Sequence, residues 1–389
     1  MTPLETTTAA IPSNIPASLN ALADEWEYFV DTGKLIGKNV RPVIAKSWLR
    51  CRELAISPLE ERARSVLSAE EIEAKLHHEN LGLSGKNVLD RMAQTVEGTR
   101  HTIVLADESG RILYSVGHRQ IQEHLEKINF RPGGGWHENM VGPNGIGTTL
   151  ALDHPELVMG SEHFCQGWQP WVCYGAPIHN PSNHSTLGCI DITGPADKVC
   201  VEAMALAISI TQSIEVNLFA MQLKNREVLR DAYSEMRMKW PNDASFVFDE
   251  NGYIVDINSY ACDLLNISST ALSRIPFSHS HPDLWLNVQS CINDGFEREF
   301  EVNLQNPFMD SISCLVKPIG ISGKILGCAI VFTSGRRVDN APESLRSNED
   351  DLIRKTLFQT GGNISKAARI LNIDRATIYR RRKHWQSSR

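Results

Sequence analysis

The sequence predicts an α+β multidomain protein, in which a long helix links two strand-rich regions and an all-α helix-turn-helix lies at the C-terminal end. Three observations support this prediction. Short β-like runs separated by turn residues gather in two stretches, 101–192 and 246–332. The segment between Pro195 and Pro241 contains neither Gly nor Pro, which is typical of one long helix. The segment 348–389 reads as short helices with a basic end.

Composition and targeting signals are those of an ordinary soluble chain. Of its 389 residues, 42% are hydrophobic and 22% are charged. No apolar run reaches the length of roughly 18 residues that a membrane span needs. The beginning of segment 1–24 is rich in Thr, Ala and Pro and lacks the basic start and apolar core of a signal peptide. We therefore expect a disordered tail over 1–24, a cytoplasmic location and no membrane partner.

The cysteines give no sign of a metal or redox motif. There are nine, scattered from Cys51 to Cys328, and no CxxC pair exists. His163, Cys165 and Cys173 could suggest a metal site or a redox pair, but no fourth ligand has a suitable spacing. We interpret these three as ordinary buried residues, and we predict no cofactor, no metal and no catalytic residue.

The first strand-rich region follows a helical segment expected over 25–88. His101–Ala106 and Arg111–Val116 are β-like runs, and the four residues between them are a hairpin signal. A glycine-rich stretch follows from Pro132 to Gly147. Two more strands are expected at Trp171–Ile178 and Leu187–Ile192. The predicted domain covers 89–195.

The long helix expected over 196–240 has an apolar stripe. Six positions alternate by four and three, as in the seam of a two-stranded coiled coil: Ile214, Leu218, Met221, Asn225, Val228 and Ala232. The alternative is a single helix that packs on its own domain. Both interpretations stay open, because Asn225 and Ala232 are weak seam residues.

The second strand-rich region is expected over 241–334. A hairpin is expected at 246–257, a short helix at Ala261–Leu265, and strands at Phe300–Leu304, Ser311–Lys317 and Leu326–Phe332. Segment 335–347 is polar and reads as a linker.

Three helices fit the C-terminal segment 348–389. The first is Asn348–Thr360, with Leu352, Ile353 and Leu357 on its inner face; the second runs to Leu371, and Asn363 or Ser365 caps it; the third is Arg375–Lys383, and Asp374 caps it. Ala367 and Ala368 allow close packing, and Ile373 and Ile378 supply a shared core. Tyr379 fits either the core or a groove, with the core preferred.

The basic residues are concentrated at this end. Residues 364–389 carry a net charge of +7, which leaves −14 for the rest of a chain whose total is −7. A basic end on an acidic body is typical of a DNA-binding appendage, since phosphates attract it. The candidate DNA-binding residues are Ser365, Lys366, Arg375, Thr377, Arg380 and Arg381.

The same segment resembles the Fis-type helix-turn-helix of bacterial enhancer-binding regulators. The matching residues are Gly361 to Arg369, then Leu371, Ile373 and Arg375 to Arg380. The resemblance implies a homodimer that recognises an inverted-repeat operator in double-stranded DNA.

The first strand-rich region resembles the GAF sensor domain of acetoin-catabolism regulators. The matching strings are 136–138, 141–148, 160–164, 176–178 and 187–194. A GAF domain encloses a small-molecule pocket, and aromatic walls with a few polar groups suit a small effector. The candidate ligand-binding residues are Trp136, Glu138, Glu162, His163, Trp168 and Trp171.

The region 241–334 resembles a PAS domain through 248–258, Ala261 and Leu264-Leu265. His279 and His281 could ligate haem in such a fold, but we favour a loop location without that role.

Regulators of this enhancer-binding family usually carry a central AAA+ ATPase. This chain has no GxxxxGK[ST] loop, and the nearest string, at Gly85-Lys86-Asn87, fails the spacing. We predict a ligand-responsive transcription regulator that is not an enzyme and does not hydrolyse ATP, with RNA polymerase as a further candidate partner. The alternatives are a GAF-based cysteine-dependent reductase and a haem or thiol redox sensor.

Overall fold

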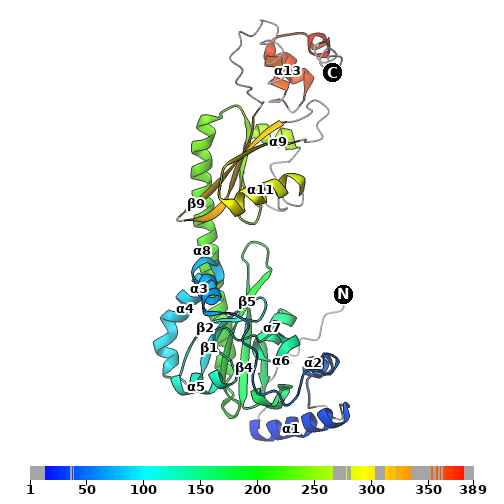
Figure 1. Cartoon of the computed structure of the whole chain (residues 1–389), viewed down its shortest axis with the longest axis vertical. Coiled ribbons are helices and arrows are strands. Elements are labelled where there is room, and N and C mark those ends of the chain that lie inside the picture. Colours follow the sequence, from blue (N-terminus) through cyan, green and yellow to red (C-terminus); the bar gives the residue numbers. More distant parts are fainter. Residues whose placement is uncertain are drawn as a thin grey trace. The chain divides into compact units, whose positions relative to one another are not determined.

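The computed structural model describes residues 14–35, 37, 39–265, 277, 282–302, 312–321, 323–333, 352–353, 356–357, 360 and 362–380. The chain divides into two compact units, Met1–Met221 and Gln222–Arg389, and their boundary falls within the long helix α8. Each unit contains one five-stranded sheet, and Figure 1 labels some of their elements. The two expected strand-rich regions are therefore confirmed as mixed α/β bodies.

Four helices precede the first sheet: α1 (Ile15–Thr32), α2 (Pro42–Glu53), α3 (Ala69–His78) and α4 (Asn80–Glu97). The prediction of a disordered tail over 1–24 is wrong for its second half, because α1 begins at Ile15. The start of α1 is marked in the sequence by its N-cap residue, Asn14, whose side chain accepts a hydrogen bond from the Ala17 amide at 3.2 Å.

The first sheet is antiparallel and has the order β2-β1-β5-β4-β3. Its strands are β1 (Thr102–Asp107), β2 (Ile112–Gly117), β3 (Glu156–Met159), β4 (Trp171–His179) and β5 (Thr186–Pro195). Four of them lie close to the expected runs. The edge strand β3 was not predicted, because four residues carry too short a pattern to read.

The second half of the glycine-rich stretch contains α6 (Glu138–Val141) and the start of α7 (Gly145–Leu152); α5 (Arg119–Lys127) precedes the stretch. The Asn144 side chain accepts hydrogen bonds from the amides of Ile146 and Gly147 at 3.0 and 2.9 Å. These two backbone donors at the start of α7 are therefore satisfied within the protein. A Cβ on Gly175 of β4 would lie 2.0 Å from the Gly145 carbonyl, so glycine here lets α7 lie directly on the sheet.

The opposite face of the first sheet is covered by α4 and the first half of α8 (Val201–Lys239). The Ser84 hydroxyl of α4 donates to the Ile214 carbonyl of α8 at 3.1 Å. Ile214 and Leu218 are 0% and 3% exposed and belong to the core of this unit. The coiled-coil interpretation of their stripe is therefore wrong at these positions, because both side chains are already buried within their own domain.

Helix α8 also has an exposed apolar face. By length and composition it is the one candidate membrane span in the described residues, with a mean hydropathy of 1.4 over an 18-residue window. Only 28% of that window is buried. Among the exposed apolar side chains are Val216, Phe219 and Leu223.

The second sheet has the order β7-β6-β10-β9-β8. Its strands are β6 (Ala244–Asp249), β7 (Ile254–Ile257), β8 (Arg298–Val302), β9 (Ile312–Ile321) and β10 (Lys324–Thr333). Helices α9 (Ser259–Leu265) and α11 (Pro282–Asp294) share an aromatic core with one face. The second half of α8 packs on the other face, where the Tyr233 hydroxyl donates to the Ser245 carbonyl at 2.7 Å.

Candidate functional site

The C-terminal helices are held together by a small apolar core. Ala367 and Ala368 of α13 (Ile364–Leu371) are buried together with Ile378 of helix 375–380. Ile353 and Leu357 complete this core, whereas Leu352 is 55% exposed and does not face inward as expected. The two alanines let the helices approach closely, as the sequence predicts.

Local hydrogen bonds set the turn between these two helices. Asn363 is the N-cap of α13, because its side chain accepts from the Lys366 amide at 3.0 Å. Asn372 ends α13 in the left-handed conformation, with φ of +52°. The Asp374 carboxylate accepts from the Ala376 amide at 3.2 Å and so begins the next helix.

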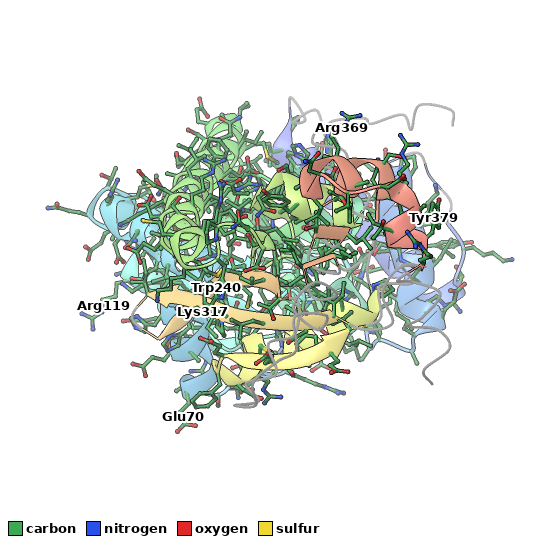
Figure 2. All side chains as sticks on the ribbon, turned by 90° about the horizontal axis from the view of Figure 1, so that it is seen from above. Glu70, Arg119, Trp240, Lys317, Arg369 and Tyr379 are labelled. Carbon is green, nitrogen blue, oxygen red and sulfur yellow. The ribbon has the colours of Figure 1, made fainter. Side chains whose placement is uncertain are left out.

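The candidate DNA-binding residues lie along these helices. Lys366, Arg375 and Arg380 are exposed, and Ser365 and Thr377 are half-buried. Tyr379 is 57% exposed, so the preference for the core is wrong. Figure 2 shows Arg369 and Tyr379 extending from these helices. Arg381 lies outside the described residues, as do His279 and His281.

Two of the candidate ligand-binding tryptophans pack edge to face inside the first unit. The rings of Trp136 and Trp168 lie 4.8 Å apart at 64°, and both side chains are nearly fully buried. Their indole nitrogens donate to the carbonyls of Asn129 (3.1 Å) and Val141 (2.9 Å). Trp171, at the start of β4, is half-buried. The polar atoms of the packed pair are thus used within the protein.

The two candidate carboxylates are bound by residues of α2 and by Arg41, which directly precedes it. Glu162 accepts from Arg41 at 2.7 Å, and the same guanidinium reaches Glu156 at 3.1 Å. Burial alone would lower the pKa of Arg41, but the attraction and hydrogen bonds of the Glu162 and Glu156 carboxylates outweigh burial and raise this pKa. Glu138 accepts from Ser47 and from Arg50, both of α2.

Two further indoles reinforce this contact. Trp26 of α1 donates to the Phe164 carbonyl at 2.8 Å, and Trp48 of α2 donates to the Glu162 carbonyl at 2.9 Å. We call the segment α1–α2 with these contacts the clasp. The clasp covers the short segments that carry Glu138, Glu162 and His163. No short-range pattern indicates it, because Trp26, Arg41 and Trp48 lie more than 80 residues before their partners.

Four buried cysteines of the first unit are poorly suited to thiolate chemistry. Burial raises the pKa of Cys51 and of Cys165 to about 12, and the pKa values of Cys173 and Cys189 rise well above the usual range. A thiol rather than a thiolate is therefore present at neutral pH, which disfavours the reductase and thiol-sensor alternatives.

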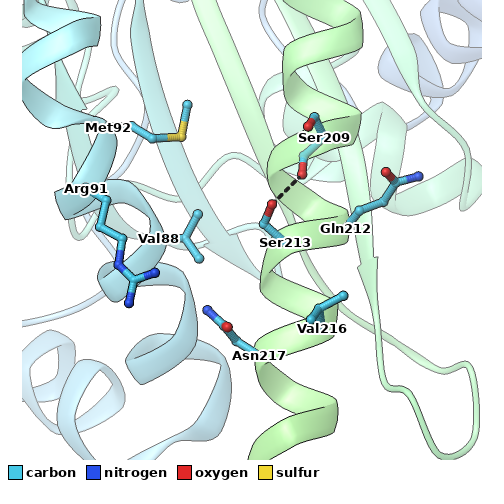
Figure 3. Close-up of a pocket in the computed structure, with 8 residues that line it drawn as sticks. All are labelled: Val88, Arg91, Met92, Ser209, Gln212, Ser213, Val216 and Asn217. Carbon is cyan, nitrogen blue, oxygen red and sulfur yellow. Dashed lines mark hydrogen bonds between the residues drawn. The ribbon is translucent and has the colours of Figure 1, made fainter.

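A groove of about 470 Å³ lies between α4 and α8, on the other face of the first sheet. Figure 3 shows Val88, Arg91 and Met92 on α4 facing Ser209, Gln212, Ser213, Val216 and Asn217 on α8. None of the six candidate ligand-binding residues lines this groove.

Two family models match the chain. The model described as "MimR, N-terminal domain" matches residues 21–216, and the model described as "Bacterial regulatory protein, Fis family" matches residues 344–385. The first match covers the clasp, the first sheet and the first half of α8. The second covers the C-terminal helices.

Two relatives with named functions each match more than half of the chain. The acetoin dehydrogenase operon transcriptional activator AcoR of Bacillus subtilis (strain 168) is 32% identical over 203 residues, which is 52% of this chain and 33% of the relative. The propane 2-monooxygenase operon transcriptional activator MimR of Mycolicibacterium smegmatis is 28% identical over 235 residues, 60% of this chain and 39% of the relative. The chain thus spans between a third and a half of the length of these relatives.

Among solved structures, the DhaR(N)–DhaL complex of E. coli is similar at 18% identity, with a TM-score of 0.45 and coverage of 76% of this chain and all of that one. The family assignment is made from the sequence matches and not from this structural similarity. These confirm the resemblance to acetoin-catabolism regulators and the Fis-type helix-turn-helix. With 196 of its 389 residues in the first match, the chain belongs to the family defined by the MimR N-terminal domain.

Proposed function

We propose that this chain is a ligand-responsive, sequence-specific DNA-binding transcription regulator and not an enzyme. The observation that carries the proposal is the basic, exposed surface of helix 375–380, held on a packed core within the Fis-family segment. Exposed arginines on such a helix can read guanine edges or hold phosphates. The operator is an inverted repeat in double-stranded DNA, and the active form is a cytoplasmic homodimer that contacts RNA polymerase.

The sensing part is the first unit. We propose that its sheet is a GAF-type domain over 89–195, joined by the helix 196–240 to a PAS-type domain over 241–334. Relatives are named for operons of acetoin dehydrogenase, propane 2-monooxygenase and glycerol metabolism. These names support an effector that is small and uncharged, such as a short alcohol or ketone.

The candidate wall of the effector site is the set chosen from the sequence. Because Trp136, Glu138 and Trp168 are buried beneath the clasp or in the core beside it, an effector reaches them only when the clasp opens. Binding to that state shifts the population toward it, and α8 carries the change onward. No step of this scheme uses ATP.

A thermal-shift screen tests this proposal on the full chain, with acetoin, glycerol and propan-2-ol as probes. A compound that binds only the folded state stabilises it by about 2.7 kcal/mol at a hundredfold excess over its dissociation constant. We expect one probe to raise the melting temperature, and Trp168→Phe, which lacks the indole donor, to reduce that rise. Full retention of the rise in Trp168→Phe and Trp168→Ala would place the effector elsewhere.

A further inference from the structure

Four polar side chains lie in a row inside the first sheet body, on the face that α7 covers. They are Asp191 and Thr193 of β5, Cys173 of β4 and His163. The strand register places Thr193 opposite Cys173, and Asp191 one pleat further along the same face. All four are buried, with at most 4% of their surface exposed.

The distances between them form a continuous path. His163 Nδ1 lies 2.9 Å from the Gly160 carbonyl oxygen, and its Nε2 lies 3.6 Å from Cys173 Sγ. Thr193 Oγ1 lies 3.3 Å from the same sulfur and 2.5 Å from Asp191 Oδ2.

The hydrogens on this path can be counted from the histidine end. A carbonyl oxygen only accepts, so His163 carries its hydrogen on Nδ1. Burial lowers the pKa of His163 to about 4, which keeps the ring neutral and makes Nε2 an acceptor. Cys173 is a thiol, because burial raises its pKa well above the usual range, and so it donates to Nε2. Its sulfur then accepts from the Thr193 hydroxyl.

Thr193 has only one hydrogen, yet its Oγ1 lies within hydrogen-bond distance of both the Cys173 sulfur and Asp191 Oδ2. Both contacts are hydrogen bonds at the same time only if Asp191 Oδ2 carries a hydrogen and donates it to Thr193. We propose that Asp191 is a protonated carboxylic acid in the folded protein and begins a one-way chain of hydrogen bonds that ends at the Gly160 carbonyl.

The surroundings of Asp191 agree with a neutral acid. Its other oxygen, Oδ1, is buried without a hydrogen-bond partner in the structure. An uncharged carbonyl oxygen tolerates this position far better than a carboxylate does. Around it, α7 contributes Gly145 and β1 contributes Val104, neither of which titrates.

The remaining titratable neighbours of Asp191 are the thiols of Cys173 and Cys189 and, through Cys173, the ring of His163. Asp107, which also acts on Cys189, is paired with Arg111 at 2.8 Å and with Lys75 at 3.5 Å. In the gap-free part of the structure, 39–221, no cation is paired with Asp191.

The proton on Asp191 is released near neutral pH, because burial raises the pKa of this carboxyl to about 7. Once the carboxylate forms, the Thr193 hydroxyl donates its hydrogen to Asp191. The Cys173 sulfur then no longer accepts a hydrogen bond from Thr193. The two ends of the chain touch different helices. A Cβ on Gly160 would lie 2.4 Å from Leu19 of α1, and one on Gly145 of α7 would lie 1.9 Å from Asp191 Oδ1. A change in the protonation of Asp191 therefore rearranges the middle of a row of hydrogen bonds whose two ends lie beside α1 and α7.

Infrared difference spectroscopy of the full chain tests this inference. Wild type minus Asp191→Asn, at about pH 5, should show the carbonyl band of a protonated carboxylic acid, and this band should vanish at about pH 9. The matched control is Asp107→Asn, which removes a buried but ion-paired carboxylate and should show no such band. Absence of the band from the first difference, or an equal band in the control, overturns the proposal.

A second pair of variants keeps the test open if Asp191→Asn fails to fold. Thr193→Ser keeps the hydroxyl, and Thr193→Val removes it. In wild type and Thr193→Ser, a carboxylic acid band should titrate near neutral pH, and Thr193→Val should shift its frequency. An unshifted band in Thr193→Val, or no titrating band in wild type, means that Asp191 is not the protonated group.

Discussion

The guanidinium of Arg41 lies 2.7 Å from the carboxylate of Glu162, and this contact ties the residue before α2 to the loop after β3. The side chains are 17% and 4% exposed. Arg41 also reaches Glu156 and the carbonyl of Leu157. One arginine thus satisfies three acceptors on the edge strand β3 and the loop that follows it, and the clasp is held by charge as well as by its tryptophans.

Arg41→Ala should therefore destabilise the first unit by about 3 kcal/mol, because removal of one partner leaves buried carboxylates unpaired. Urea denaturation of the full chain measures this loss. Arg119→Ala is the matched control, since its pair with Glu123 is exposed on both sides (86% and 58%) and should add almost nothing. Equal effects of the two substitutions would contradict the role given to Arg41.

The two faces of α8 predict opposite results for neighbouring residues. Ile214→Ala should cost about 2–5 kcal/mol, because its side chain is completely buried in the first core. Val216→Ala should change the free energy of unfolding by less than about 0.5 kcal/mol, since Val216 is 66% exposed. The same denaturation experiment compares them. A large loss of unfolding free energy in Val216→Ala, without one in Ile214→Ala, would mean that the buried and exposed faces of α8 are assigned incorrectly.

The helix itself was easy to predict, but its orientation was not. The absence of Gly and Pro between Pro195 and Pro241 predicts α8 almost to its ends. The four-three spacing of Ile214 and Leu218, however, is the same for a coiled-coil seam and for a helix on a sheet. The burial of these side chains in their own unit and the contact with Ser84 of α4 decide between them, and no local pattern reveals a contact between residues 130 positions apart.

Acid should destabilise the first unit through His163. Burial lowers its pKa to about 4 from an ordinary 6.5, so the unfolded chain binds this proton more readily. The stabilisation is complete above about pH 6.5 and is lost as the pH falls through 4, up to about 3 kcal/mol. His163→Gln should flatten this acid limb in a series of denaturation curves. An unchanged limb in the variant would show that His163 already titrates normally.

Recognition of DNA should depend on Arg375. Its side chain is exposed on the helix that Ile378 anchors, so Arg375→Ala should weaken binding to a specific site by about 1–3 kcal/mol without unfolding the segment. Fluorescence anisotropy with a labelled duplex measures the change, and Arg119→Ala, in the other unit, again serves as the control. Unchanged affinity in Arg375→Ala would remove this helix from the DNA interface.

The sequence predicted the DNA-binding segment better than the sensing region for a physical reason. In the C-terminal helices, caps such as Asn363 and Asp374 and the small residues Ala367 and Ala368 act over a few positions. In the first unit, the aromatic residues were recognised, but their partners come from far along the chain. Trp168 bonds to Val141, and Glu162 bonds to Arg41, and such pairings have no short-range signature.

An effector bound to the first unit should change the affinity of the C-terminal helices for DNA. Duplexes selected from a random pool by the full chain would supply the site, and the thermal-shift screen would supply the compound. The dissociation constant for that duplex, measured by anisotropy, should change about tenfold when the compound is added, a coupling of roughly 1.4 kcal/mol. An identical dissociation constant with and without a compound that stabilises the protein would contradict it.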